Sequence, residues 1–532
     1  MLLTNFLRRR LFRAGFFALL GLLATSAADV ASAQAPAGDF RRIATFPVVL
    51  NTCDGQPASC WDTETVSEIV TVSPDGKTLI YTDAATGNIG FVDITDPANP
   101  LPGGFIPTSG EPTSVTVGKG YVLAAVNTSE DYVNTSGELL VIDIATHAVV
   151  RTIELGGQPD SVSVSPNQQH AVVVIENERN EDLCVGGTLN GQEVDDDECE
   201  DGGGELGIPG QSPAGYVTIV DLQGPRPSSW TTRKISLLGR ADLYPSDPEP
   251  EFVDISYSNV AVVTLQENNA IVLIHVPTGR VLDSFSARTV DLTQIDTEEE
   301  DTISLTGSLQ GIRREPDGVV WISNQEFATA DEGDLVGGSR GFTIFRADGG
   351  IRYTSGNSIE HLAVRIGHYP ESRSENKGTE PEGVEFGLYG SRRFLFVGTE
   401  RSSFVAVYEI PPIGDPIFKQ VLPGGSGPEG LLAIPSRNLF VTASENDARG
   451  DVLRSALTIY ELGGTSDYPT IVSTNRSDRT PIPWSALSGL SSDPVDPNIV
   501  WTVSDSYYAE GRIYKMDVSS KPAVILDEMV VR

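Results

Sequence analysis

The stretch IVTVSPDGKTLIYT, residues 69–82, together with IGFVDI, residues 89–94, decides the fold class. Two short segments rich in Val, Ile and Thr flank the turn Ser-Pro-Asp-Gly, and a third apolar segment ends in Val-Asp-Ile. Short β-branched runs bounded by such turn residues are typical of antiparallel strands. A more polar segment then completes a unit of four strands.

This unit recurs along the chain at a spacing of about 40–50 residues where no insertion intervenes, which is the spacing of propeller blades. The first strands of the seven copies are expected at Ile69–Val72, Ser114–Val117, Ser161–Val164, Phe252–Ile255, Leu309–Ile312, Gly383–Phe386 and Gly430–Ile434. One blade cannot bury its own faces, so blades stack in a ring. We therefore predict an all-β fold, a seven-bladed β-propeller over residues 40–465. A β-sandwich would not explain a repeat of this length.

Residues 466–532 form one more blade-like unit, with strands expected at Ile499–Ser504, Arg512–Asp517 and Ala523–Leu526. Two interpretations stay open. The unit is either an eighth blade or the truncated start of a second domain, and the apolar strand close to the end of the sequence favours the second.

Residues 1–33 read as a signal peptide, with four Arg before a short apolar stretch and the small residues Ala31-Ser32-Ala33 before the expected cleavage point. The apolar stretch is shorter than the roughly 20 residues that span a bilayer, and we expect no transmembrane segment after signal removal. The protein is thus expected to be exported, periplasmic or extracellular. Arg9-Arg10 leaves the choice between the Sec and twin-arginine routes open.

The chain is strongly acidic, with 73 Asp and Glu against 37 Lys and Arg and a net charge of −36. Such a polyanion repels nucleic acids and anionic lipids and attracts divalent cations or basic partners. We expect no nucleic-acid partner. The same charge also keeps an exported protein soluble without any ligand.

Four cysteines form two close pairs in sequence, Cys53 with Cys60 and Cys184 with Cys199. An even number of cysteines in an exported chain favours disulfides, and local pairing is the simplest of the three possible arrangements. No His lies near either pair at zinc-site spacing, which argues against metal binding by these residues.

Acidic residues recur in step with the repeats. They stand at or before the first strand (Asp160, Glu251, Glu382 and Glu429) and after the second strand (Glu176, Glu267, Glu326, Glu400, Glu445 and Asp505). In a propeller the first strand lines the central channel, so equivalent strand ends converge on one face. We predict a carboxylate ring near the channel mouth, which could supply the six to eight oxygen ligands that Ca²⁺ takes. Its candidate ligands are Asp160, Glu251, Glu382, Glu400, Glu429 and Glu445. Turn chemistry is nevertheless the favoured interpretation of these acids, in which they cap turns and accept hydrogen bonds from loop amides.

No catalytic constellation is recognisable in the sequence. The string Gly337-Gly338-Ser339-Arg340-Gly341 fits G-x-S-x-G, but it leads into a strand, whereas the hydrolase elbow needs a following helix. The five His are scattered without a metal-binding spacing, and no phosphate-binding or dinucleotide motif is present. Catalytic residues therefore stay unknown.

Several repeats resemble those of the bacterial choice-of-anchor I proteins, secreted propellers related to YVTN and LVIVD repeat proteins. The stretches that carry this resemblance are 159–166 (PDSVSVSP), 382–387 (EGVEFG), 396–401 (FVGTER) and 427–431 (GPEGL). The terminal unit resembles the opening of the phytase-like domain, described as having esterase-like activity, through 486–490 (ALSGL) and 503–506 (VSDS). That second match covers about 50 residues, which is too few to complete such a domain.

Two functions follow as hypotheses. The first is a non-catalytic exported propeller, a binding or scaffold protein that presents its face to a protein, a glycan or a cation. The second, implied by the phytase-like resemblance, is a calcium-dependent phosphoesterase acting on a phosphate ester. The first is favoured because no catalytic set is visible and a fold does not by itself imply a function.

Overall fold

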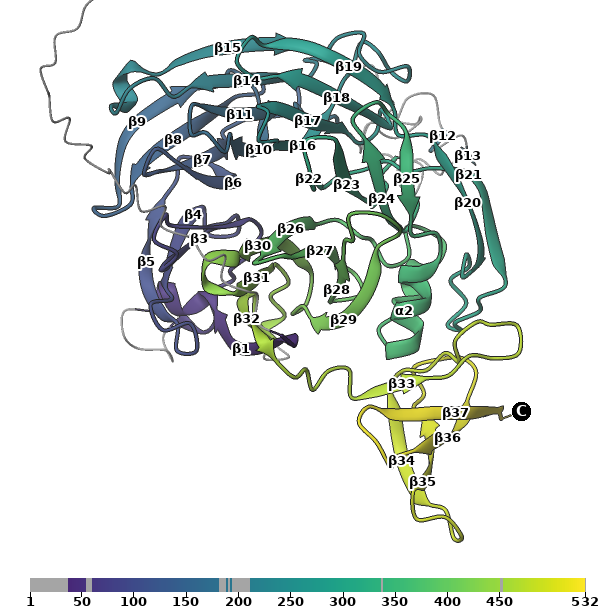
Figure 1. Cartoon of the computed structure of the whole chain (residues 1–532). Helices are drawn as coiled ribbons and strands as arrows, with labels where there is room; N and C mark the ends of the chain where they lie inside the picture. The colour runs from purple at the N-terminus through teal and green to yellow at the C-terminus, as the bar shows by residue number, and fades with distance from the viewer. Residues whose placement is uncertain are drawn as a thin grey trace, which may run out of the picture. The chain divides into compact units, whose positions relative to one another are not determined.

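The computed structural model describes residues 37–53, 60–180, 188–189, 192–193, 211–335, 338–449 and 453–531. Within these residues, seven four-stranded antiparallel sheets follow one another along the chain, named blades 1 to 7 below (Figure 1). The all-β prediction and the propeller fold are confirmed. The expected signal peptide at residues 1–33 lies outside the described residues.

The strands of blades 1 to 4 are β2 (Val70–Val72), β3 (Thr78–Asp83), β4 (Asn88–Asp93) and β5 (Leu101–Pro107); β6 (Glu111–Gly118), β7 (Tyr121–Asn127), β8 (Gly137–Asp143) and β9 (Ala148–Glu154); β10 (Pro159–Val164), β11 (His170–Ile175), β14 (Tyr216–Asp221) and β15 (Thr231–Ser236); and β16 (Pro250–Ile255), β17 (Val260–Leu265), β18 (Ala270–His275) and β19 (Arg280–Ser286). Those of blades 5 to 7 are β22 (Val319–Trp321), β23 (Glu326–Asp331), β24 (Gly341–Arg346) and β25 (Ile351–Thr354); β26 (Val384–Tyr389), β27 (Arg392–Thr399), β28 (Phe404–Glu409) and β29 (Ile417–Pro423); and β30 (Pro428–Ile434), β31 (Leu439–Ser444), β32 (Ala456–Gly464) and β1 (Asp39–Pro47). Outside the blades lie the hairpins β12 (Thr188–Leu189) with β13 (Gln192–Glu193) and β20 (Thr289–Ile295) with β21 (Gly307–Arg313), helix α2 (Ser358–Ile366), and the short 3₁₀ helices η1 (Val48–Thr52), η2 (Pro227–Ser229), η3 (Glu371–Arg373) and η4 (Pro435–Arg437).

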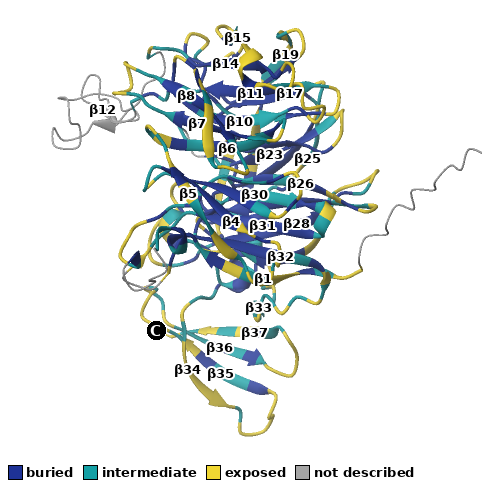
Figure 2. Ribbon diagram, turned by 90° about the vertical axis from the view of Figure 1, so that its left-hand side faces the viewer, coloured by how far each residue is buried: buried dark blue, intermediate teal, exposed yellow. Residues whose placement is uncertain are grey.

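The innermost strands of the seven blades contact one another around a closed ring. In chain order they are β2, β6, β10, β16, β22, β26 and β30, and β30 packs against β2. The second and third strands of each blade are mostly buried, whereas the outer strands contain many exposed residues (Figure 2). Stacked blades therefore bury one another's faces, as the repeat analysis predicts.

The amino-terminal strand closes the ring. β1 pairs antiparallel with β32, from Asp39 opposite Gly464 to Pro47 opposite Ala456, and becomes the outer strand of blade 7. Phe40 on β1 is fully buried, with its ring at 5.2 to 5.3 Å from those of Tyr389, Phe394 and Phe396. The repeat pattern did not identify this strand, because its partner β32 lies more than 400 residues later in the sequence.

The fifth repeat differs from its prediction. Leu309–Ile312, expected as a first blade strand, lies in β21 and pairs with β20 in a separate two-stranded hairpin. The first strand of blade 5 is instead β22, Val319–Trp321. The hairpin strand, GSLQGIR, contains only Leu309 and Ile312 as large apolar residues, and it precedes the apolar Val319–Trp321 as a first blade strand would precede a second.

Residues 471–530 form a five-stranded sheet that is distinct from the blades. Its strands are β33 (Ile471–Ser473), β34 (Leu487–Ser492), β35 (Ile499–Ser504), β36 (Arg512–Asp517) and β37 (Ala523–Val530), with β33 parallel to β37. Helix α2, which the sequence analysis did not predict, contacts β33. The Arg365 guanidinium on α2 donates to the Ser473 carbonyl at 2.7 Å, and the backbone carbonyl of Arg365 accepts from the Trp484 indole at 3.0 Å. None of the helices among the described residues is long and apolar enough to cross a membrane.

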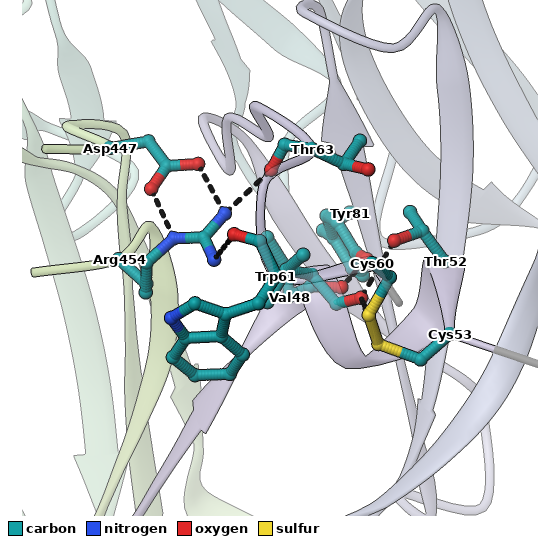
Figure 3. Close-up of a disulfide and its surroundings, with 10 residues drawn as sticks. Val48, Thr52, Cys53, Cys60, Trp61, Thr63, Tyr81, Asp447 and Arg454 are labelled. Atoms are coloured by element: carbon teal, nitrogen blue, oxygen red, sulfur yellow. Dashed lines mark hydrogen bonds and ion pairs between the residues drawn. A yellow bond between two sulfur atoms is a disulfide. The ribbon is translucent and has the colours of Figure 1, made fainter. Parts of the chain in front are cut away.

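A disulfide joins Cys53 to Cys60, with their Cα atoms 5.1 Å apart (Figure 3). Beside it, Arg454 of blade 7 donates to the carbonyl oxygens of Trp61 and Thr63 at 2.6 Å and stacks on the Trp61 ring. The segment that follows the disulfide is therefore held against the last blade. Cys184 and Cys199 lie outside the described residues.

Candidate metal centre

A half-buried carboxylate stands just before or at the start of the inner strand in six of the seven blades, whereas Glu111 at the start of the blade 2 strand is exposed. These six ring carboxylates are Glu68, Asp160, Glu251, Asp317, Glu382 and Glu429. In five of them the acid follows a proline, which presets an extended entry into the strand. Blade 2 has Thr113 at this position, and its hydroxyl donates to the backbone carbonyls of Pro159 and Asp160 at 3.0 Å.

Close backbone packing brings neighbouring ring carboxylates together. A Cβ atom on Gly383 would overlap the carbonyl oxygen of Glu429, and one on Gly430 would overlap that of Glu68. The Gly318 amide, one blade earlier, donates to the carbonyl of Glu382 at 3.2 Å. Glycine after the acid therefore lets each inner strand approach the next blade at the level of the ring.

Five of the six ring carboxylates line the central channel. A cavity of about 340 Å³ is bounded by these five, namely Asp160, Glu251, Asp317, Glu382 and Glu429. The remaining lining comprises Val, Leu and Ile side chains, several Ser and Thr hydroxyls, and the further carboxyls Asp254, Glu332 and Glu385. Among the described residues that line this cavity there is no Lys, Arg or His.

Burial and repulsion by neighbouring acids raise the pKa values of the ring carboxylates. Burial raises the pKa of Glu68 to about 8, and Glu111 and Glu445 add to this rise. Burial likewise raises the pKa of Asp160 to about 7, with Glu178 contributing. The pKa values of the other four ring carboxylates lie well above their usual range, first through burial and then through neighbouring acids.

The ring carboxylates differ from the glutamates that precede them in the same motif. Glu249, Glu315 and Glu380 stand two residues before a ring carboxylate, are at most 1% exposed, and each has an arginine partner. The closest of these arginine contacts are 2.6 Å for Glu249 and Glu380 and 3.9 Å for Glu315. In the part of the chain that the structure describes, none of the six ring carboxylates forms an ion pair. The first acid of the motif thus has an arginine beside it, and the ring carboxylate that follows has none among the described residues.

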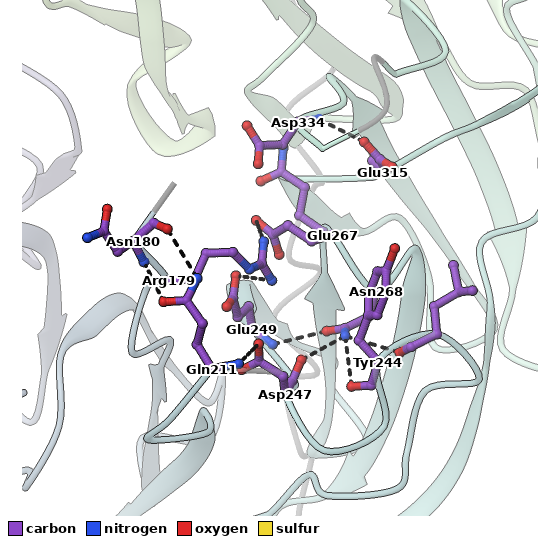
Figure 4. Close-up of polar contacts among 12 residues, drawn as sticks. Arg179, Asn180, Gln211, Tyr244, Asp247, Glu249, Glu267, Asn268, Glu315 and Asp334 are labelled. Carbon is purple, nitrogen blue, oxygen red and sulfur yellow. Dashed lines mark hydrogen bonds and ion pairs between the residues drawn. The ribbon is translucent and has the colours of Figure 1, made fainter. Parts of the chain in front are cut away.

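Figure 4 shows how the first type of glutamate is neutralised. The Arg179 guanidinium lies 2.6 Å from Glu249 and 4.0 Å from Glu267, and all three side chains are almost fully buried. Asn268 supports the site by donating to the Asp247 carbonyl at 2.9 Å and by accepting from the Glu249 amide at 3.0 Å. One oxygen each of Glu249 and Glu267 has no hydrogen-bond partner among the described residues.

Among the residues that the structure describes, three groups of acids bring one ligand atom from each member to within 4.8 Å of the others, as a cation site requires. They are Asp160, Glu176 and Glu251; Asp317, Glu332 and Glu382; and Glu332, Glu380 and Glu400. Carboxylate clusters of this kind suit Ca²⁺, which prefers oxygen ligands. The groups are named trio 1, trio 2 and trio 3 below.

The structure places the six predicted ligands in two settings. Asp160, Glu251, Glu382 and Glu429 line the channel cavity. Glu400 lies in trio 3 with Arg401 at 2.7 Å, and Glu445 follows β31, where its side chain accepts from Asn446 at 3.1 Å.

Two further acids expected at this face lie elsewhere. Glu326 begins β23 instead of following it and pairs with Arg352 at 2.7 Å, so Glu332 takes the expected position in blade 5. Asp505 follows β35 of the carboxy-terminal sheet and is not part of the ring.

Sequence reasoning missed Glu68, Asp317 and Glu332. The signal for Asp317 was present, since Glu-Pro-Asp at 315–317 repeats the Glu-Pro-Glu of 249–251 and 380–382. The misplaced strand in the fifth repeat concealed it. Glu68 lacks the preceding proline, so its position emerges only from the register of β2 with β3.

Comparison with solved structures supports the fold. The structure of U3-55K matches with a TM-score of 0.50 and 9% identity over 80% of this chain and 100% of that chain. The WD40 repeats of RRP9 match with a TM-score of 0.50 and 10% identity over 80% and 99%. At such identities the likeness shows the fold alone. None of the curated proteins compared with this chain matches it.

A family model covers most of the ring. Residues 68–337 and 335–412 match the choice-of-anchor I domain, a span that runs from the first ring carboxylate to the third strand of blade 6 and ends before β29. The phytase-like resemblance of residues 486–506 falls outside this span and stays a prediction. By this match over more than half of its length, the chain belongs to the choice-of-anchor I domain family.

Proposed function

We propose that this protein is an exported propeller that binds a hard divalent cation, calcium by preference, at the carboxylate-lined channel, and that it acts as a binding or scaffold protein. One observation carries the proposal. Within the part of the chain that the structure describes, the ring carboxylates form no ion pair, whereas the three buried glutamates that stand two residues earlier in the same motif each have an arginine partner. Acids that are needed only for the fold would be expected to be paired in the same way.

Calcium fits the donor set. The trios offer carboxylate oxygens only, and calcium accepts six to eight such ligands in flexible geometry, whereas magnesium retains several waters. A bound cation would offset the repulsion that raises the pKa values of these acids. The Ser and Thr hydroxyls on the channel wall suit polar groups of a glycan or a protein loop that also reaches the cation.

The test is calorimetric titration of chelator-treated mature protein with calcium, together with thermal melting. At a hundredfold excess over Kd, a ligand that binds only the folded state stabilises it by about 2.7 kcal/mol. For a unit of this size that corresponds to a rise in melting temperature of ~3 °C. Glu251→Gln combined with Glu382→Gln, which changes two of the three acid groups at once, should abolish both signals, and Glu461→Gln, a half-exposed acid paired with Arg41 outside the channel, should leave them unchanged. Absence of heat in the wild type would refute the proposal.

The phosphoesterase alternative rests on the resemblance of the carboxy-terminal unit. A phosphate ester in the channel would depend wholly on the cation, because the described lining contains no basic side chain. This composition favours the binding role. Hydrolysis of a generic phosphate ester that requires calcium and is lost in Glu382→Gln would establish the alternative instead.

Export is part of the proposal. The disulfide between Cys53 and Cys60 is of the kind that persists in oxidising compartments. Fractionation of the native host into cytoplasm, periplasm and medium tests the location, and recovery of the protein in the cytoplasm alone would contradict it.

A further inference from the structure

The three acidic trios differ in how far the protein itself neutralises them. In trio 3, Glu380 lies 2.6 Å from Arg373 and 3.1 Å from Arg401, and Glu400 lies 2.7 Å from Arg401. Two guanidinium groups therefore pair with Glu380 and Glu400, and the third acid, Glu332, lies 3.6 Å from Lys377. Trio 3 needs no ion to explain its geometry.

Trio 2 contains one internal cation. The Lys377 ammonium lies 3.6 Å from Glu332 and 3.3 Å from Asp334, and its side chain is 19% exposed. Although burial opposes it, the charges of Glu332 and Asp334 raise the pKa of Lys377, so the ammonium stays charged. Asp317 and Glu382 form no ion pair within the described residues, and one Glu382 oxygen is buried without a hydrogen-bond partner.

Trio 1 has no internal cation. In the described chain, Asp160, Glu176 and Glu251 are absent from every ion pair, although their ligand atoms lie within 4.8 Å of one another. The nearby Arg179 is already engaged by Glu249 and Glu267.

A fourth acid provides independent support for a ligand at trio 1. Glu267 is 4% exposed, and its Oε2 is buried without a hydrogen-bond partner among the described residues. It stands two residues beyond the end of β17, whose Leu265 is opposite Pro250, the neighbour of Glu251. Its charge adds to the raised pKa of Glu176, after burial, Asp160 and Glu178, and to the raised pKa of Glu251, after burial and Glu176. A buried carboxylate oxygen without a partner is costly unless a cation approaches it.

We propose that Asp160, Glu176 and Glu251 form the primary calcium site, between blades 3 and 4. Lys377 acts at trio 2 as a tethered substitute for a second ion. This assignment rests on the proposed cation binding. It adds the position of the bound ion, the number of ions, and the reason why trio 1 and trio 2 bind calcium differently. Glu176, which follows β11, is the ligand that distinguishes trio 1 from the remainder of the ring.

Calcium titrations of the mature chain in a calorimeter test the assignment, with calcium as the only added ligand. The wild type should bind one ion tightly. Glu176→Gln should weaken that binding ~10-fold or more, because site charge sets calcium affinity. Asp317→Asn, the matched change in trio 2, should leave the tight binding within about twofold. Lys377→Met should raise the stoichiometry from one to two, since it frees Glu332.

Each outcome decides between the two proposals. No calcium binding by the wild type overturns both. Tight binding that persists in Glu176→Gln and in Asp160→Asn overturns only the assignment to trio 1, and unchanged stoichiometry in Lys377→Met overturns the substitute role of the lysine. Melting curves in chelator show that each variant is folded. If Glu176→Gln does not fold, Glu251→Gln tests the same trio.

Discussion

Glu385 on the channel wall makes folding stability depend on pH in a direction that can be stated in advance. Its Oε1 accepts a hydrogen bond from the Ala433 amide at 3.2 Å, and burial raises its pKa to about 8 from an ordinary value of 4.5, with Asp254 adding to the rise. At pH values between 4.5 and about 8, Glu385 is therefore protonated in the folded state and ionised in the unfolded state. By linkage, the free energy of unfolding falls as pH rises through this window.

The magnitude follows from the width of the window. Each pH unit is worth about 1.4 kcal/mol for one group, so raising the pH from about 5 to about 7.5 costs roughly 3 kcal/mol at Glu385. Glu385→Gln retains an oxygen acceptor for Ala433 but cannot ionise. It should match the wild type near pH 5 and exceed it by roughly 3 kcal/mol near pH 7.5, or ~3 °C in melting temperature.

Urea unfolding in chelator at both pH values measures this difference, because ring carboxylates common to both proteins cancel in the comparison. Glu154→Gln, an exposed strand glutamate, serves as the control and should follow the wild type at both pH values. If Glu385→Gln also runs parallel to the wild type, Glu385 does not hold a proton at neutral pH and the reasoning fails.

Three further changes have expected effects on the free energy of unfolding by denaturant. Phe40→Ala should lose about 3–5 kcal/mol, since the ring is fully buried among four aromatic side chains, and a loss under 1 kcal/mol would mean that β1 does not close the ring. Arg179→Met should lose about 3–5 kcal/mol by leaving Glu249 buried and unpaired, and adding Glu249→Gln should restore part of it; no restoration would contradict the pairing. Replacing Cys53 and Cys60 by Ser should cost roughly 2–3 kcal/mol for so short a loop, and a reducing agent should have no effect on that variant at this site.

The fold was predictable wherever the evidence is local. The turn at Ser73-Pro74-Asp75-Gly76 hydrogen bonds as expected, with the Gly76 amide donating to the Ser73 carbonyl at 2.8 Å. Alternation and turn residues located most inner strands to within a few positions. Periodicity could not reveal β1, whose pairing with β32 joins residues more than 400 positions apart and leaves no repeat signal.

The candidate site was predictable in kind but not in membership. Recurrence of acids at strand ends indicated a carboxylate ring, and Asp160, Glu251, Glu382 and Glu429 do line one cavity. Which of the surrounding acids has a basic partner depends on arginine and lysine residues from other blades and loops, such as Lys377. Those contacts depend on tertiary packing, which one sequence does not encode in any short pattern.

The pairing of β1 with β32 also has a consequence for biogenesis. β1 is the earliest part of the propeller to be synthesised, and the ion pair between Arg41 on β1 and Glu461 on β32 joins residues 420 positions apart. At roughly 5–20 residues per second, the strand waits on the order of 20–80 s for its partner. During that interval β1 has no sheet to join, and the ring is open at its last blade. Export machinery or a chaperone that holds this short segment would therefore control when the propeller becomes a closed, protease-resistant body.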